Sequence, residues 1–311
     1  MIFCLMTCGG GEKPAAESQA LQDAVRGDAP RRFVLPVIPG ELTRAGERAG
    51  YLAAHYWDHF DFSDTACVHL PQITEQALAD YLDVFSHTDR AAVEASIPAM
   101  LDRARREDRS GTMYRHFISL YKKYLYDPNS PVRNEEYYIP VVRYILGDSL
   151  TVEADRQRAG FELEMLLKNR LGAPATDVSY TLANGQTGRL YSLRKEYTLL
   201  FFYNPGCPAC KETTASLASS EVINRLLLSG RLDILAVYPD SDLDLWKKHA
   251  GEMPSTWLVS YDKGQSLFGR KLYDLKAIPS LYLLDALKHV LLKDAAAEAV
   301  EQYLAEQSGP A

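Results

Sequence analysis

The sequence is poor in cysteine, in basic charge and in long hydrophobic runs. Five cysteines among 311 residues are too few for a disulfide-rich scaffold but enough for one redox pair. No stretch of about eighteen apolar residues occurs, so no membrane-spanning helix is predicted. The net charge of -7 argues against nucleic acid as a partner, because phosphate binding needs a concentrated basic face.

Several motifs of enzymes are also missing. The sequence has no glycine-rich phosphate loop, no serine elbow and no paired-carboxylate signature. A zinc site needs two Cys-x-x-Cys pairs, or one pair with histidines at matching spacing, and this chain has one pair. The histidine nearest to Cys210 is His249, 39 residues away (249 − 210). We therefore expect no metal and no cofactor.

The chain divides into halves whose apolar residues follow different periods. In residues 33–171 they recur at three- and four-residue intervals, which predicts an all-α helical domain. Residues 1–32 have a short apolar start followed by small and polar residues, and we interpret them as a signal-like start and a tether. The helices expected in the first half cover residues 42–60, 74–85, 91–107, 113–126, 135–146 and 156–171.

Residues 172–311 alternate strand-like and helix-like segments, which predicts an α/β domain. A hairpin is expected around Asn184-Gly185, and the run 197–203 is apolar throughout, as in a strand buried on both faces. Because βαβ units place their strands parallel, we expect a largely parallel central sheet. The other expected elements are strands at 232–238, 257–260, 280–284 and 289–293, and helices at 210–228, 243–250 and 295–306.

The first residues resemble the end of a bacterial lipoprotein signal. Leu5-Met6-Thr7-Cys8 is similar to a lipobox, in which the cysteine is lipidated, so Cys8 is the candidate for lipidation. A signal peptide has a charged start and an apolar core of about 7–15 residues, and both are incomplete here. We interpret the segment as the tail of a signal that starts upstream of Met1, with an ordinary N-terminus as the alternative. The protein is then expected in the periplasm or cell envelope, with a lipid anchor as its membrane contact.

One Cys-x-x-Cys pair carries the chemistry. Cys207-Pro208-Ala209-Cys210 follows the strand-like run and opens a helix-like segment. At a helix start, unpaired N–H groups and the helix dipole stabilise a thiolate. Two intervening residues bring both sulfurs within one turn, and Pro208 fixes the backbone between them. The spacing predicts a pair that attacks a substrate disulfide and resolves the mixed disulfide, with a structural disulfide or a zinc site as alternatives.

The segment around this pair resembles a known active site. Residues 200–211, Leu-Phe-Phe-Tyr-Asn-Pro-Gly-Cys-Pro-Ala-Cys-Lys, are similar to the active-site segment of thioredoxin-fold proteins. They most resemble bacterial extracytoplasmic thiol–disulfide oxidoreductases related to the cytochrome-maturation reductases. Residues 277–285 resemble that family's cis-proline loop and the strand after it, and the likeness covers residues 172–311. The whole arrangement resembles Bacteroidetes lipoproteins with an N-terminal helical domain of unknown function.

The resemblance implies a role for each residue that matches it. Cys207 is the expected nucleophile and Cys210 the resolving thiol, and together they form the redox disulfide. Pro279 is the expected cis-proline. Ile278, whose backbone pairs with substrate in that family, and Pro208 are the expected substrate-binding residues.

Phe201 departs from the thioredoxin pattern. Thioredoxins have a buried aspartate six residues before the first cysteine, where it assists removal of the proton from the buried thiol. Phe201 occupies that position here, so we expect Glu196, just before the strand, or water to take over this task. Slow or pH-sensitive turnover is the expected consequence.

The sequence therefore predicts an extracytoplasmic enzyme, a thiol–disulfide oxidoreductase that reduces protein disulfides. Ala209 favours a reductase, because strongly oxidising members have a histidine beside the second cysteine. The expected partners are protein thiols and disulfides and an upstream electron donor that the sequence does not identify. The alternative is a non-catalytic thioredoxin-like adaptor with a structural disulfide at Cys207 and Cys210.

Overall fold

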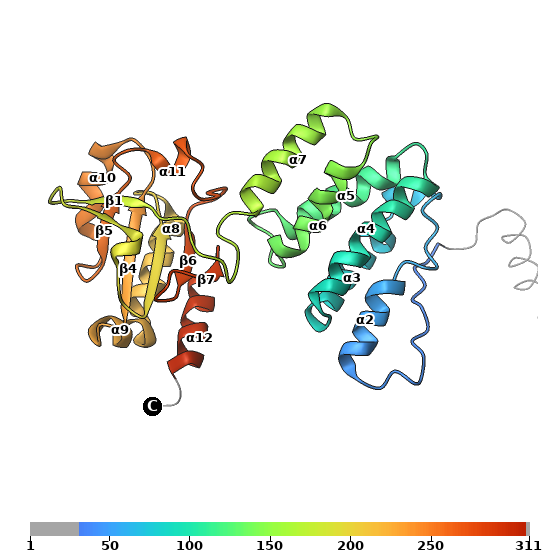
Figure 1. Cartoon of the computed structure of the whole chain (residues 1–311), viewed down its shortest axis with the longest axis horizontal. Helices are drawn as coiled ribbons and strands as arrows, with labels where there is room; N and C mark the ends of the chain where they lie inside the picture. The colour runs from blue at the N-terminus through green and yellow to red at the C-terminus, as the bar shows by residue number, and fades with distance from the viewer. Residues whose placement is uncertain (1–30, 309–311) are drawn as a thin grey trace, which may run out of the picture. The chain divides into compact units, whose positions relative to one another are not determined.

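The computed structural model describes residues 31–308 (Figure 1). These residues divide into two compact units between Leu125 and Tyr126. The domain boundary expected after residue 171 stays a prediction. Cys8, the candidate for lipidation, lies outside the described residues. Within residues 31–308, no helix combines the length and the apolar composition that crossing a membrane requires.

The described part of the first unit contains helices and no strands. The α-helices have 11 to 18 residues, and each begins within three residues of an expected helix start. The elements are α2 (Ala45–His55), η1 (Thr65–His69), α3 (Pro71–Val84), η2 (Phe85–His87), α4 (Arg90–Glu107) and α5 (Thr112–Leu125).

An aromatic cluster fills the core of this unit. The ring of Trp57 contacts those of Phe60, Tyr81 and Phe117 at centroid distances of 5.1 to 5.5 Å. Arg103 donates hydrogen bonds to the carbonyl oxygens of Trp57 (2.6 Å) and Phe60 (3.1 Å). These bonds provide donors for backbone carbonyl groups that lie outside a regular helix. The helix expected over residues 42–60 is therefore wrong beyond residue 55, because this part of the chain turns its aromatic side chains into the core.

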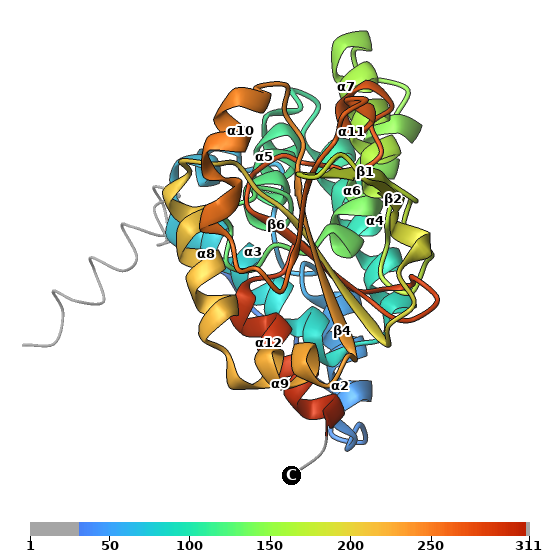
Figure 2. The same cartoon turned by 90° about the vertical axis from the view of Figure 1, so that its left-hand side faces the viewer.

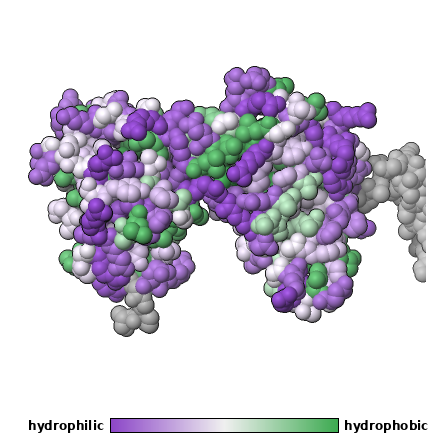
Figure 3. All heavy atoms as spheres, in the orientation of Figure 1, coloured by the Kyte–Doolittle hydropathy of each residue, from purple (hydrophilic) through white to green (hydrophobic). Residues whose placement is uncertain are grey.

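The second unit begins with two helices, α6 (Glu135–Gly147) and α7 (Glu153–Leu166). The first matches the expected range 135–146, whereas the second starts three residues before the expected range 156–171 and ends five residues before its end. Figure 3 shows hydrophobic side chains gathered around α7 on an otherwise largely hydrophilic face. In residues 150–171 the large apolar side chains that are exposed are those of Leu150, Val152, Phe161, Leu167 and Leu171.

A seven-stranded sheet follows, with the strand order β2-β1-β5-β4-β3-β6-β7. Only β3–β4 and β4–β5 are parallel, and the other four pairs are antiparallel. The expectation of a largely parallel sheet is wrong, because the β1–β2 hairpin and the β6–β7 pair add antiparallel edges to the βαβ core. The strands are β1 (Ser179–Leu182), β2 (Thr187–Arg189), β3 (Tyr197–Phe202), β4 (Leu232–Tyr238), β5 (Leu258–Tyr261), β6 (Ser280–Leu284) and β7 (Val290–Lys293).

Both faces of the central strands are buried, as the apolar run 197–203 predicts. Leu199 and Phe201 of β3 pack under helices on one face, whereas Leu200 and Phe202 pack with residues around α11 (Ser266–Gly269) on the other. Figure 2 shows the first face covered by helices. These are α8 (Pro208–Ser219), α9 (Glu221–Leu228), α10 (Leu243–His249) and α12 (Ala297–Ser308).

The single helix expected over residues 210–228 is two helices. Ser220 has an extended backbone between them, and its hydroxyl accepts a hydrogen bond from the backbone N–H of Ile223 at 3.3 Å. Serine at this position caps the second helix, so the chain changes direction there.

Candidate redox site

The two cysteines lie at the end of β3, where the chain turns into α8. The backbone N–H of Cys207 donates to the carbonyl of Asn204 at 3.2 Å and closes a turn with Pro205 and Gly206 at its centre. Gly206 has a φ of +80°, which glycine adopts at little cost and which suits the third position of such a turn. The local sequence thus places the first cysteine at the start of the helix.

Cys207 is the N-cap residue of α8, and Pro208 is in its first turn. The Cys207 sulfur accepts a hydrogen bond from the backbone N–H of Cys210 at 3.4 Å, and the side chain is half-buried. Backbone N–H groups in the first turn of a helix lack partners within the helix. Cys207 therefore combines partial accessibility with a backbone donor directed at its sulfur.

Cys210 lies one turn further and is only 3% exposed. Its sulfur accepts a hydrogen bond from the backbone N–H of Asn204 at 3.4 Å and packs in an apolar cluster with Phe201 and Leu217. Burial raises the pKa of the Cys210 thiol well above its ordinary value, and the adjacent Cys207 raises it further. Both cysteines are free thiols in the structure, and Cys210 holds its proton at neutral pH.

The loop before β6 lies beside Cys207. Ser280, the first residue of β6, is paired with Phe202, the last residue of β3, so the sheet brings Pro279 to the same edge as the cysteines. The Ile278–Pro279 peptide bond is cis, and the Cys207 thiol lies 3.8 Å from the carbonyl oxygen of Ile278. The structure thus brings together the residues singled out in the sequence, while their roles toward substrate stay predictions.

Glu196 is a wrong candidate for the proton acceptor of Cys210. Glu196 lies directly before the first residue of β3. The six residues of this strand, at roughly 3.3 Å each, put about 20 Å between Glu196 and the end of β3 that leads to Cys207. Its carboxylate forms a two-bond ion pair with Arg231 (2.6 and 2.8 Å), which holds the pKa of Glu196 below its ordinary value. Phe201 is fully buried, as the sequence predicts for that strand, and leaves water as the remaining expectation.

Two groups near Cys210 were not predicted from the sequence. The backbone N–H of Asn204 bonds to the sulfur, a contact that only the turn geometry creates. Tyr203 packs in the same cluster, and its hydroxyl accepts a hydrogen bond from the indole N–H of Trp246 at 2.8 Å. Nothing in the spacing of residues 203 and 246 indicates this pair. In residues 31–308 no group of three or more His, Cys, Asp or Glu side chains is arranged to hold a metal ion.

Comparison with known proteins assigns the chain to a family. Residues 8–169, just over half of the chain, match the model of a domain of unknown function, DUF5106. The chain belongs to the DUF5106 family. It is also similar to the crystal structure of a thioredoxin-like protein from Bacteroides caccae, with 43% identity and a TM-score of 0.84 over 89% of this chain and 99% of that chain. The expected architecture, a helical region followed by an α/β thioredoxin-like domain, is confirmed.

Further similar structures each cover less than half of this chain. The C-terminal domain of an uncharacterized protein from Bacteroides fragilis is 51% identical over 44% of this chain and 97% of that chain, with a TM-score of 0.43. The thioredoxin domain of a thiol-disulfide oxidoreductase from Bacteroides vulgatus is 20% identical over 44% and 99%, with a TM-score of 0.39. No curated protein matches the chain.

Proposed function

We propose that this protein is a thiol–disulfide oxidoreductase that reduces protein disulfides through Cys207 and Cys210. The difference between the two thiols is the observation that carries the proposal. Cys207 is half-buried at a helix start, whereas Cys210 is buried and burial raises its pKa. A pair that divides attack from resolution needs this asymmetry, because the thiolate is the attacking species.

The reaction uses the two thiols and the substrate disulfide. The Cys207 thiolate attacks one substrate sulfur, so a mixed disulfide forms as the substrate S–S bond breaks and its other sulfur leaves and takes up a proton. Cys210 then gives up its proton and attacks the Cys207 sulfur, which releases the second substrate thiol. The substrate gains two electrons and two protons, and a dithiol protein upstream reduces the Cys207–Cys210 disulfide again.

The loop beside Cys207 supports a protein substrate. The Ile278 carbonyl lies next to the attacking sulfur, and Pro279 follows it before β6 begins. We propose that an extended substrate segment pairs with the backbone at Ile278, with Pro208 on the other side of the sulfur. A backbone pairing of this kind accepts many sequences, which suits a reductase of several protein disulfides.

Reduction of insulin disulfides by dithiothreitol tests the activity. The wild-type protein should accelerate the reaction, and the double variant Cys207→Ser/Cys210→Ser should not. Cys67→Ser is the matched control, because Cys67 is a buried thiol of the first unit. A wild-type rate equal to that of the double variant would favour the non-catalytic adaptor with a structural disulfide.

We also propose that the protein works in the periplasm or cell envelope, anchored by a lipid on Cys8. The support is the lipobox-like sequence Leu5-Met6-Thr7-Cys8. Expression from the protein's own gene in the presence of an alkyne-tagged fatty acid should label the wild type and Cys4→Ala but not Cys8→Ala. Unlabelled wild-type protein would contradict the anchor.

A further inference from the structure

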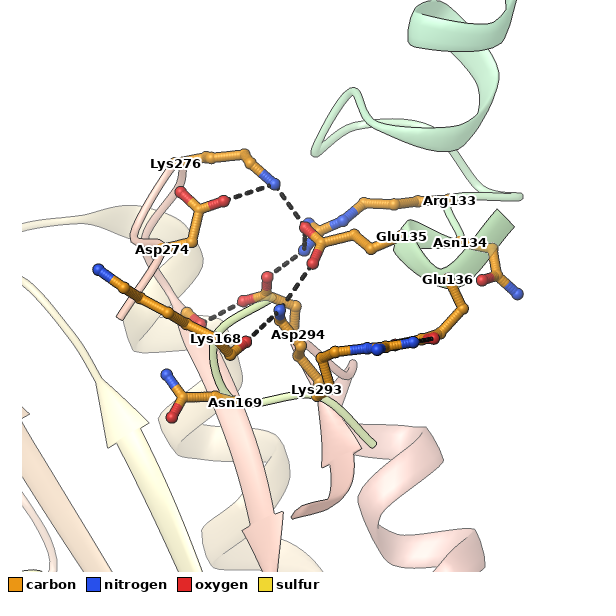
Figure 4. A network of polar contacts seen from close by, with 12 residues as sticks. Arg133, Asn134, Glu135, Glu136, Lys168, Asn169, Asp274, Lys276, Lys293 and Asp294 are labelled. Carbon is orange, nitrogen blue, oxygen red and sulfur yellow. Dashed lines mark hydrogen bonds and ion pairs between the residues drawn. The ribbon is translucent and has the colours of Figure 1, made fainter. Parts of the chain in front are cut away.

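Six charged side chains lie together beside the loop that carries Pro279 (Figure 4). Three are basic and three acidic, so their formal charges balance. Their side chains are between 9% and 16% exposed, and burial at this level is tolerated because each charge has an opposite partner. This ion-pair cluster consists of Arg133, Glu135, Asp274, Lys276, Lys293 and Asp294.

Glu135, the first residue of α6, joins two lysines from the sheet side. One carboxylate oxygen pairs with Lys276, and the other lies 2.8 Å from the amine of Lys293. Lys276 also pairs with Asp274 at 2.9 Å. Burial alone would raise the pKa of Glu135, but Lys293 and Lys276 outweigh burial and hold it below the ordinary value. Glu135 therefore stays ionised as the bridge between its two lysines.

Asp294 makes a second connection, directly after β7. One of its carboxylate oxygens pairs with the guanidinium of Arg133, and the other accepts a hydrogen bond from the hydroxyl of Ser280. Ser280 is the residue after Pro279. The start of β6 is thus tied through Asp294 to the segment that leads into α6.

The two connections hold the redox loop on both sides. Lys276 lies two residues before Ile278 and Ser280 two residues after it, and the Ile278 carbonyl faces the Cys207 thiol. Lys276 pairs directly with Glu135, and Ser280 is linked to Arg133 through Asp294. The DUF5106 match covers Arg133 and Glu135 but ends before the redox loop. A helical family domain therefore supplies charges that fix a loop of the thioredoxin-like domain.

We propose that Arg133 and Glu135 are positioning residues for the redox site, holding residues 274–280 so that the Ile278 backbone stays against Cys207 and open to a substrate segment. The catalytic consequence rests on the proposed function, whereas the positioning of the loop does not.

The neighbouring residue Glu136 provides a matched control. Its carboxylate pairs with the guanidinium of Arg170, with one N–O distance of 3.0 Å, and both side chains are partly buried. Glu136 lies in the same helical turn as Glu135, but neither Glu136 nor Arg170 belongs to the 274–280 loop. Glu135→Gln and Glu136→Gln remove one negative charge each from adjacent positions, so a difference between them reports the connection to the loop.

Hydrogen exchange, alkylation of Cys207 and insulin kinetics together test the inference. In Glu135→Gln we expect about tenfold faster amide exchange at residues 277–281, because a charged hydrogen bond is lost, and a clearly smaller increase in β3 and β4. The rate of Cys207 alkylation by iodoacetamide should change with it, and KM for insulin should rise more than kcat falls. Glu136→Gln should match the wild type in all three measurements.

Two outcomes would overturn the inference. One is a Glu135→Gln protein that matches Glu136→Gln at residues 277–281. The other is a Glu135→Gln protein in which exchange in β3 and β4 accelerates by the same factor as at residues 277–281, which is a purely structural effect. If Glu135→Gln does not fold, Ser280→Ala removes only the hydroxyl on Asp294, and unchanged exchange at residues 277–281 in that variant would be equally decisive. A wild type that fails to reduce insulin refutes the proposed function, while exchange and alkylation still decide the positioning.

Discussion

The two sides of the candidate site are built in different ways. On the cysteine side, the contacts join residues 204–210 and belong to one turn and one helix start. On the proline side, they join residues as far apart as Arg133 and Asp294, 161 positions along the chain. The first side therefore contains the two thiols and is specified by local sequence. The second side sets the position of a loop and exists only in the folded chain. Changes on the two sides should have different consequences.

The largest effect is expected on the cysteine side, from separating attack and resolution. Cys210→Ser keeps the nucleophile but cannot resolve the mixed disulfide, so it should accumulate a covalent adduct with a disulfide substrate. Turnover should fall by roughly a thousandfold or more, as for loss of a reacting group. Mass spectrometry of the protein after incubation with a peptide disulfide measures the adduct. Cys207→Ser is the control, and an equal adduct in both variants would contradict the assigned order of attack.

The next effect sharpens the contrast between the two thiols. Because the pKa of Cys210 is raised, its thiolate fraction increases about tenfold per pH unit while the pH stays below that pKa. Release of the second thiol should accelerate by roughly this factor per unit from pH 7 to 9, since Phe201 offers no proton acceptor. Stopped-flow measurement of the mixed disulfide made with a chromogenic thiol follows this step. A flat profile would mean that another group removes the Cys210 proton.

On the proline side, a smaller and different effect is expected. Arg133→Met leaves Asp294 without its guanidinium partner at a nearly buried site. Breaking such a pair should lower the free energy of unfolding of the second unit by about 2–4 kcal/mol. The urea dependence of amide exchange in β3 measures this loss. Glu196→Gln breaks the exposed pair with Arg231 and should change the free energy of unfolding little. Equal losses in the two variants would show that the ion-pair cluster stabilises the unit no more than an exposed pair does.

Acid should weaken the same cluster, by an amount smaller than that of Arg133→Met. The folded-state pKa of Glu135 lies below the ordinary value of 4.5, so its contribution is present above that pH and is lost as the pH falls through the folded pKa. Burial raises the pKa of Asp274, which acts in the opposite direction. Wild type should therefore lose more stability than Glu135→Gln between pH 5 and pH 3, measured by urea unfolding. Parallel curves for the two proteins would contradict the bridging role of Glu135.

These contrasts explain how far the sequence alone could lead. The all-α first half, the strand before Cys207 and the placement of Pro279 near it followed from periodicity and from a motif resemblance. The sheet direction was wrong because strand order does not reveal which strands run back, as β6 does beside β3. Glu196 was wrong because closeness in sequence was taken as closeness in space, although a strand separates its two ends.

The ion-pair cluster had no signal in the sequence. Charged residues are common in the chain, at 24% of all positions, and nothing distinguishes Arg133 or Asp294 from those that face water. Their meaning comes from burial and from partners that the fold brings from two distant segments. A motif whose residues are close in the sequence can be recognised from the sequence. Ion pairs between distant segments can be found only in the structure.

The most direct test of the central claim is the reduction potential of the Cys207–Cys210 pair. Equilibration of the protein in dithiothreitol buffers of defined potential, followed by trapping of free thiols and mass spectrometry, measures it. The account predicts ready exchange and a potential above about −300 mV, with Cys207 trapped faster than Cys210. A pair that stays oxidised and exchanges with neither buffer nor substrate would be a structural disulfide, and it would contradict the account.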